Sequence, residues 1–128
     1  MKNLKNLFSV ILLSIFVISC SNDDDDSTKV KYEISGIDSS VTQIKYKKGN
    51  GSIETITDFE EFGDSKTVSV SDYPFTADLE VTINNTTGAS KAYTLIINVD
   101  GEPAAFTPLV VPANTISTGV VDFVIETE

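Results

Sequence analysis

Apolar and polar residues alternate in short stretches along most of the chain from residue 29 onward. In the first stretch, residues 29–35, Val30, Tyr32 and Ile34 fall on one side of an extended chain and polar residues on the other. Such alternation is the pattern of a β-strand with one buried face. No stretch sustains the period of about 3.6 residues that an amphipathic helix needs. The pattern therefore predicts a domain built of β-strands.

The later stretches predict further strands, each with its own inward apolar residues. The stretch 41–46 contains Val41, Ile44 and Tyr46, and its step of three residues predicts a β-bulge near Thr42 and Gln43. The inward residues expected in the other strands are Ile53 and Ile56 in 52–57, Val68 and Val70 in 66–71, Ala77, Leu79, Val81 and Ile83 in 77–83, Tyr93, Leu95, Ile97 and Val99 in 92–99, Phe106, Leu109 and Val111 in 104–111, and Val121, Phe123 and Ile125 in 120–126.

Turn-forming residues separate these strands. Residues 48–52 and the pair Asp100-Gly101 predict hairpin turns, because Gly, Asn and Asp tolerate a positive φ. Other turns or loops are expected at 58–65, 72–75 and 84–88.

Two prolines indicate where one strand lies in its sheet. Pro103 and Pro108 place the 104–111 strand at an edge, because proline has no amide to donate to a central ladder. Seven or eight strands at this spacing predict an all-β fold, an antiparallel immunoglobulin-like or transthyretin-like β-sandwich over residues 29–128.

The first 19 residues have the features of a signal peptide. Lys2 and Lys5 precede the run 7–18, which is apolar apart from two serines. A helix of that length is about 18 Å long, too short for the roughly 30 Å hydrocarbon core of a bilayer. The segment 1–19 is therefore expected to be cleaved from the mature protein.

The end of this segment resembles the lipobox of bacterial lipoproteins. Val17, Ile18 and Ser19 precede Cys20, which is the only cysteine in the sequence. In lipoproteins this cysteine is acylated and becomes the first mature residue, so the resemblance implies lipid attachment at Cys20. Two or three acyl chains hold a protein stably at a membrane, whereas one chain binds only marginally.

Residues 20–28 are expected to form the acylated cysteine and an acidic tether. The tether comprises Ser21, Asn22, Asp23, Asp24, Asp25, Asp26, Ser27 and Thr28. Four adjacent carboxylates repel one another and stay in solvent. The stretch resembles the acidic export signal of surface-exposed lipoproteins of Bacteroidota, which implies an outer-membrane location at the cell surface. In the same group, residues 26–28 resemble an O-glycosylation motif, which makes Ser27 a candidate glycosylation residue.

Four parts of the domain resemble, in order, motifs of the small mycobacterial membrane proteins. They are residues 30–36, the set Val41, Ile44 and Tyr46, residues 66–70 and residues 95–101. The resemblance implies an extracytoplasmic β-sandwich that assists a lipid-exporting transporter of the resistance-nodulation-division class. That family carries a domain cysteine pair and a transmembrane anchor, whereas this sequence has a single cysteine and a predicted lipid anchor.

Composition narrows the functional classes. The chain has no histidine, so the usual general base at neutral pH and the commonest metal ligand are missing. Its formal net charge of −10 argues against nucleic acid as a partner, because phosphate binding needs clustered basic residues. We expect no cofactor.

Four carboxylates within seven residues form one candidate site. Asp58, Glu60, Glu61 and Asp64 supply enough oxygen ligands for a Ca²⁺ ion if the chain folds around it. Phe59 and Phe62 lie among them and are expected to enter the core, which favours a solvated acidic loop instead.

The only basic cluster consists of Lys45, Lys47 and Lys48. It fits contact with anionic headgroups or an acidic partner. Lysines that discourage edge-to-edge aggregation of a strand explain it equally well.

Three functional hypotheses follow. The leading one is a non-catalytic, lipid-anchored lipoprotein that binds a protein or a glycan at the cell surface. The second is the transporter accessory that the family resemblance implies, facing the periplasm. The third is a small glycan-acting enzyme with paired carboxylates. For that role the sequence has no tryptophan to stack on a sugar, and Tyr32, Tyr46 and Tyr93 fall at inward strand positions.

Overall fold

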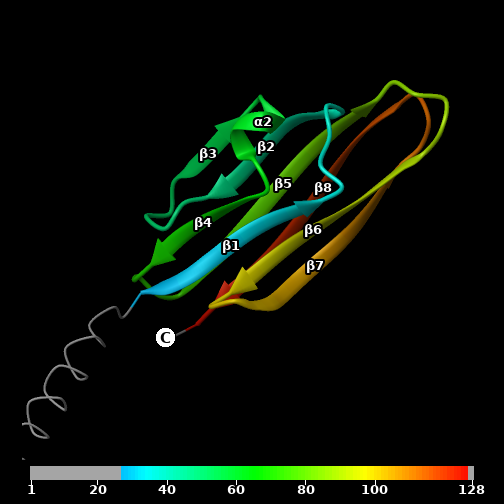
Figure 1. Cartoon of the computed structure of the whole chain (residues 1–128). Coiled ribbons are helices and arrows are strands. Elements are labelled where there is room, and N and C mark those ends of the chain that lie inside the picture. Colours follow the sequence, from blue (N-terminus) through cyan, green and yellow to red (C-terminus); the bar gives the residue numbers. More distant parts are fainter. Residues whose placement is uncertain (1–26, 127–128) are drawn as a thin grey trace, which may run out of the picture.

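Two four-stranded antiparallel sheets face each other and form a β-sandwich, as Figure 1 shows. The computed structural model describes residues 27–126. The strands are β1 (Thr28–Ser35), β2 (Val41–Lys47), β3 (Ile53–Ile56), β4 (Ser65–Val70), β5 (Phe75–Asn85), β6 (Lys91–Val99), β7 (Glu102–Val111) and β8 (Thr115–Ile125), and the short helix α2 is Phe59–Phe62. The strand order is β4-β1-β6-β7 in the first sheet and β3-β2-β5-β8 in the second. The predicted β-sandwich is confirmed.

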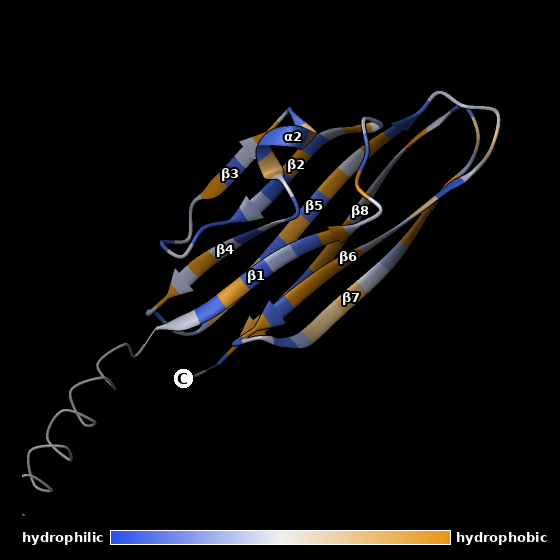
Figure 2. Ribbon diagram, viewed as in Figure 1, coloured by the Kyte–Doolittle hydropathy of each residue, from blue (hydrophilic) through white to orange (hydrophobic). Residues whose placement is uncertain are grey.

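Period-two alternation accounts for the core between the sheets. Every second residue of β5, from Phe75 to Asn85, is buried, and Figure 2 shows alternating hydrophobic and hydrophilic bands along the strands. In β1, Val30, Tyr32 and Ile34 are buried as predicted. The Tyr32 hydroxyl donates to the carbonyl oxygen of Lys47 in the opposite sheet at 2.7 Å, so the ring enters the core without leaving its polar atom unpaired.

The predicted bulge and hairpin are both confirmed. The register between β2 and β5 shifts between Val41 and Gln43. The β6–β7 hairpin turns through Asp100 and Gly101, whose φ angles are +50° and +86°. Positive φ at both central residues is the signature of a turn whose twist matches the strands on either side.

Two inward positions were predicted wrongly, and strand parity explains both. Phe106 is 70% exposed and Ile53 is 51% exposed. Phe106 is three residues from Leu109, and Ile53 is three residues from Ile56, so neither member can share a face with the other on a regular strand. In both pairs the C-terminal member faces the core and the N-terminal one faces solvent.

Four further expectations need correction, one concerning an element type and three concerning strand boundaries. The acidic loop contains helix α2, whose single turn is too short to display a helical period. Strand β5 continues to Asn85 into the expected loop 84–88, and β8 begins at Thr115, five residues before its expected start. Strand β1 begins at Thr28, inside the segment predicted as tether. Within residues 27–126, no helix is long and apolar enough to cross a membrane.

The side of the sandwich formed by β3 and β4 is closed by the turn between β2 and β3. Gly49 lies in this turn, and a Cβ built on it would overlap the backbone carbonyl of Ser69 in β4. Only glycine allows the turn of one sheet to approach the edge strand of the other so closely.

The buried side chain of Asn85 stabilises the end of the sandwich that contains the β5–β6 loop and the β7–β8 connection. Its Nδ2 lies 2.8 Å from the carbonyl oxygen of Ala89 and 3.1 Å from those of Val111 and Pro112. Its Oδ1 accepts from the amide of Thr87 at 3.0 Å and from the hydroxyl of the same residue at 2.6 Å. One side chain thereby joins the β5–β6 loop to the β7–β8 connection.

Substitution of Gly49 by alanine is expected to destabilise the fold by about 1–3 kcal/mol, because a backbone atom cannot move aside as a side chain can. Urea unfolding of Gly49→Ala measures the loss. Gly88→Ala is the matched control, since a Cβ at Gly88 meets no atom within 4 Å. Equal stability of the two variants would contradict the close approach.

Substitution of Asn85 by alanine is expected to cost about 3 kcal/mol, because it removes hydrogen bonds from buried carbonyl groups and leaves them unpaired. The neighbouring Asn84→Ala, on the outer face of β5, is expected to change stability by less than about 0.5 kcal/mol. Thermal and urea unfolding of both variants test this difference, and similar losses in the two would argue against the role of Asn85.

Candidate binding surfaces

The outer face of the second sheet carries a cluster of five charged residues, Lys45, Lys47, Asp78, Glu80 and Asp122, which we call the charged face. Lys45 lies opposite Glu80 across β2 and β5. Asp78 lies opposite Asp122 across β5 and β8. Like charges in directly opposite positions destabilise a sheet, so the pair of aspartates is an unusual feature of this face.

The environment of Asp78 favours its protonated form. Burial raises the pKa of this carboxyl, and the negative charges of Asp122 and Glu80 raise it further, while Lys47 partly compensates. Lys45, Thr55 and Ile53 join Asp78 and Glu80 in lining a shallow hollow of about 400 Å³. The charged face is thus partly neutralised from the β2 side and has no lysine on the β8 side.

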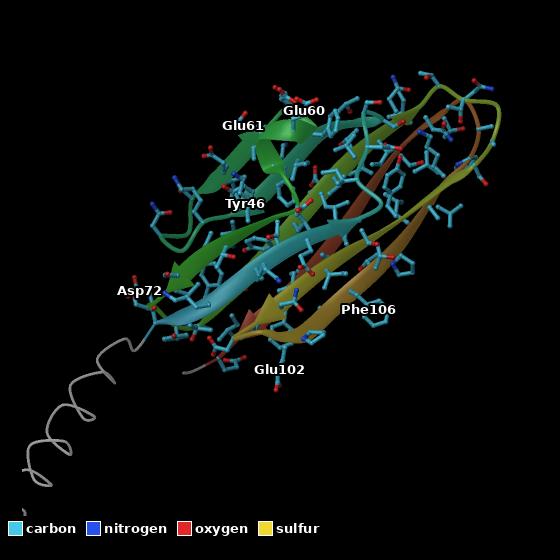
Figure 3. The ribbon with its side chains drawn as sticks, viewed as in Figure 1. Tyr46, Glu60, Glu61, Asp72, Glu102 and Phe106 are labelled. Atoms are coloured by element: carbon cyan, nitrogen blue, oxygen red, sulfur yellow. The ribbon has the colours of Figure 1, made fainter. Side chains whose placement is uncertain are left out.

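Strands β7 and β8, which are edge strands of different sheets, carry five exposed apolar side chains on the outer faces of those two sheets, and we call this set the apolar margin. They are Phe106 and Val110 on β7, and Ile116, Val120 and Val124 on β8. Each is 46–70% exposed, and Figure 3 shows Phe106 pointing away from the ribbon. The outer faces of two packed sheets point away from each other, so Phe106 and Val110 form one group, and Ile116, Val120 and Val124 form a second group on the same sheet face as the charged residues. Exposed apolar residues that recur on one face of an edge strand favour a binding surface more than residues that are exposed singly.

The two strands of the apolar margin are both edge strands, but they differ in how well they could pair with a further strand. Each is hydrogen-bonded to one neighbour, β7 to β6 and β8 to β5. Strand β7 contains Pro103 and Pro108, as predicted for an edge, and these residues have no amide hydrogen. Strand β8 has eleven residues without a proline or a lysine, and its one charged residue is Asp122. Of the two, β8 is therefore the better edge for a further strand.

A groove of about 430 Å³ lies on the first sheet, at the end of β1. It is lined by Ile34, Ser35, Gly36, Ile37, Ile96, Glu33 and Asp64. Glu33 forms an ion pair with Lys31 at 2.8 Å and accepts from Asn98 at 3.0 Å. The hydrogen bond from Lys31 is the main reason why the pKa of Glu33 lies below its usual range. Because Glu33 is already paired with Lys31 and Asn98, its carboxylate contributes to the stability of the sheet and is not free to bind a ligand in the groove.

A second set of charged residues, around Asp38, is structural. Asp38 accepts from Lys91 at 2.9 Å and from the Tyr93 hydroxyl at 2.8 Å, and its Oδ1 also accepts from the amide of Ser40. Burial alone would raise the pKa of Asp38, but these hydrogen bonds outweigh it and hold the pKa below its usual value. Burial, followed by the contact with Asp38, raises the pKa of Tyr93 to about 12. The cluster fixes the β1–β2 loop to β6.

The predicted anchor residues lie outside the described residues. They are Val17, Ile18, Ser19, Cys20, Ser21, Asn22, Asp23, Asp24, Asp25 and Asp26. Ser27, the candidate glycosylation residue, is the first described residue, and its hydroxyl accepts from the Lys29 ammonium at 3.1 Å.

The four carboxylates of the candidate Ca²⁺ site are not gathered around a common point. Asp58 caps α2, where its Oδ1 accepts from the amide of Glu60 at 3.0 Å. Glu60 and Glu61 project from α2 in Figure 3, and Asp64 faces the groove on the first sheet. In residues 27–126, no group of three acidic side chains is placed to hold a metal ion. Phe62 is buried and Phe59 is partly buried against the core, as predicted.

The basic cluster divides between two places. Lys45 and Lys47 belong to the charged face, and Lys48 lies 4.0 Å from Glu54 near the β2–β3 turn. Strand β2 lies between β3 and β5, so the interpretation of these lysines as protection of a sheet edge was wrong. The prediction that Tyr32, Tyr46 and Tyr93 face the core is confirmed.

Comparison of the sequence with protein-family models and with curated proteins gives no match. The candidate surfaces therefore rest on the chemistry of the residues described above.

Substitution of Asp122 by asparagine is expected to lower the pKa of Asp78 toward its ordinary value, although burial keeps part of the shift. A carboxyl whose pKa is higher in the folded than in the unfolded state lowers the free energy of unfolding at pH values above its folded-state pKa. This loss of stability disappears when the pH falls below the unfolded-state pKa of about 4. Asp122→Asn should therefore stabilise the protein by about 0.5 kcal/mol at pH 7 and by nothing at pH 3.

Urea unfolding at the two pH values, together with an NMR titration of the Asp78 carboxyl, measures both effects. The control is Asp72→Asn in the exposed β4–β5 turn, which should leave the Asp78 titration unchanged. An unchanged titration in Asp122→Asn as well would show that the two carboxyls do not interact.

Proposed function

We propose that this protein is a non-catalytic, lipid-anchored lipoprotein that works as a binding module at the cell surface. The observation that carries the binding role is the apolar margin, because five exposed apolar side chains on two edge strands are costly to leave in water without a partner. The anchoring role is supported by the lipobox at residues 17–20 and the acidic stretch that follows it.

The arrangement of the strands suits a tethered module. Strand β1 begins at the same end of the sandwich at which β8 ends (Figure 1). The apolar margin follows the length of β7 and β8, from Phe106 and Val124 to Val110 and Ile116, near the opposite end. A partner bound along this margin would extend away from the point where the tether enters the domain.

Replacement of Cys20 by alanine is expected to abolish incorporation of a fatty-acid label and to release the protein from membranes, because the acylated sulfur is the proposed attachment point. Labelling of cells with an alkyne fatty acid, followed by fractionation, measures this. Ser21→Ala is the matched control and should stay labelled. Labelling that persists in Cys20→Ala would exclude the anchor.

Surface exposure is tested separately in a host of the Bacteroidota group. Replacement of Asp23, Asp24, Asp25 and Asp26 by alanine should preserve fatty-acid labelling. The variant should nevertheless lose reaction with a membrane-impermeant amine reagent in intact cells. Failure of the unmodified protein to react, while it reacts after lysis, would support the periplasm-facing alternative.

A further inference from the structure

Strand β8 presents a long edge of the second sheet that is paired on one side only. It has eleven residues and is hydrogen-bonded to β5 alone. Its outer face carries Ile116, Thr118, Val120, Asp122 and Val124 in strict alternation, and the three apolar members are 46–66% exposed. An edge of this kind is a template for one more strand, since its backbone groups on the free side have no sheet partner.

The other three edges are less suited to accept a strand. Strand β3 has only four residues, and β4 lies against the β2–β3 turn at Gly49. Strand β7 contains Pro103 and Pro108, which cannot donate a hydrogen bond to an added chain. Strand β8 is thus the one long edge in the described residues without proline.

The charges around β8 indicate which side chain an added strand would bring. Asp122 lies opposite Asp78, and no lysine of the described residues forms an ion pair with Asp122. Asp78 is partly compensated by Lys47 from the β2 side. A cation placed beside Asp122 on its open side would compensate the second carboxylate in the same way.

We propose that β8 binds an extended segment of a partner protein as a ninth strand of the sandwich. The segment would carry apolar residues next to Ile116, Val120 and Val124, and a lysine or arginine next to Asp122. Main-chain hydrogen bonds to β8 supply affinity, and the alternating side chains supply specificity. This inference deepens the proposed binding function and rests on it, but not on the lipid anchor.

A second copy of the chain is a poorer occupant of this edge. A β8 strand from another molecule brings Asp122 and no lysine, so it cannot supply the cation. The formal net charge of −10 also makes two copies repel each other. The complementary chain is therefore a different protein with a basic residue among apolar ones.

The test uses the mature lipidated protein in detergent micelles and fluorescent eleven-residue peptides. The probe peptide has threonine at the positions on the inner face. On the outer face it has valine next to Ile116, Val120 and Val124, threonine next to Thr118, and lysine next to Asp122. A matched peptide has glutamate in place of lysine. Fluorescence anisotropy should show the lysine peptide binding at least about fivefold more tightly than the glutamate peptide.

Asp122→Asn should reduce this preference to less than about twofold, whereas Asp72→Asn, which alters an exposed acid in the β4–β5 turn, should leave it unchanged. Two further peptides carry N-methyl groups on alternate residues, one on the odd positions and one on the even. If a strand is added, one of the two loses binding, because only one set of amides faces β8.

Three results would overturn the proposal. The first is equal binding of both N-methylated peptides, and the second is a preference for the lysine peptide that survives in Asp122→Asn. The third is absence of peptide binding in a protein whose mass rises with concentration. That result would identify a second copy of the chain as the occupant of the β8 edge. Because the assay is done in micelles, its failure leaves the lipid anchor standing. Loss of the anchor in the Cys20 experiment likewise leaves the peptide result standing.

Discussion

The hydrogen bonds of the Asn85 side chain are the interaction on which the arrangement of the two sheets most depends. The chain passes from the second sheet to the first through the β5–β6 loop, and it returns through the β7–β8 connection. Asn85 is fully buried and contacts carbonyl groups in both passages. The backbone amide of Asn114 adds a hydrogen bond to the carbonyl of Thr87 at 3.1 Å. Buried polar groups that are all satisfied define one arrangement, because every alternative leaves one of them unpaired.

These hydrogen bonds also determine the position of the proposed binding surface. Asn85 holds the carbonyls of Val111 and Pro112, which end β7 and lead into β8. The two strands of the apolar margin are therefore fixed relative to each other at this end. Gly119 extends the contact along β8, since it is buried and its missing Cβ leaves room for the side chain of Leu109 from β7. The opposite side is closed at Gly49, so the sandwich has one sealed side and one that presents long edges.

Most of the fold follows from the sequence, because a period of two residues specifies both the strand and its buried face. Alternation identified the buried residues of β1 and β5, and Asp100-Gly101 identified a hairpin. The burial of Asn85 was not predicted. An asparagine between Asn84 and Thr86 lies in a stretch with the composition of a loop, and its burial depends on hydrogen bonds to carbonyl groups that are distant in the sequence. Phe106 was predicted to lie in the core because it is hydrophobic, although its position in the alternation along β7 places it on the outer face. The prolines of β7 predicted one edge strand, but the apolar margin was still missed, since only the strand order shows that β8 is also an edge strand and lies on the same side.

The composition of β8 raises the question of how so long an apolar edge stays soluble. Natural proteins protect such edges with lysine, proline or a bulge, and β8 has none of these in its eleven residues. Its protection consists of Asp122, placed opposite Asp78, within a protein of net charge −10. Two such edges repel each other wherever their aspartates come close, while a segment that brings a cation is attracted. One carboxylate then serves both purposes. It discourages association with identical copies and favours a basic partner, and the repulsion between Asp78 and Asp122 is the stability that the fold gives up for this discrimination.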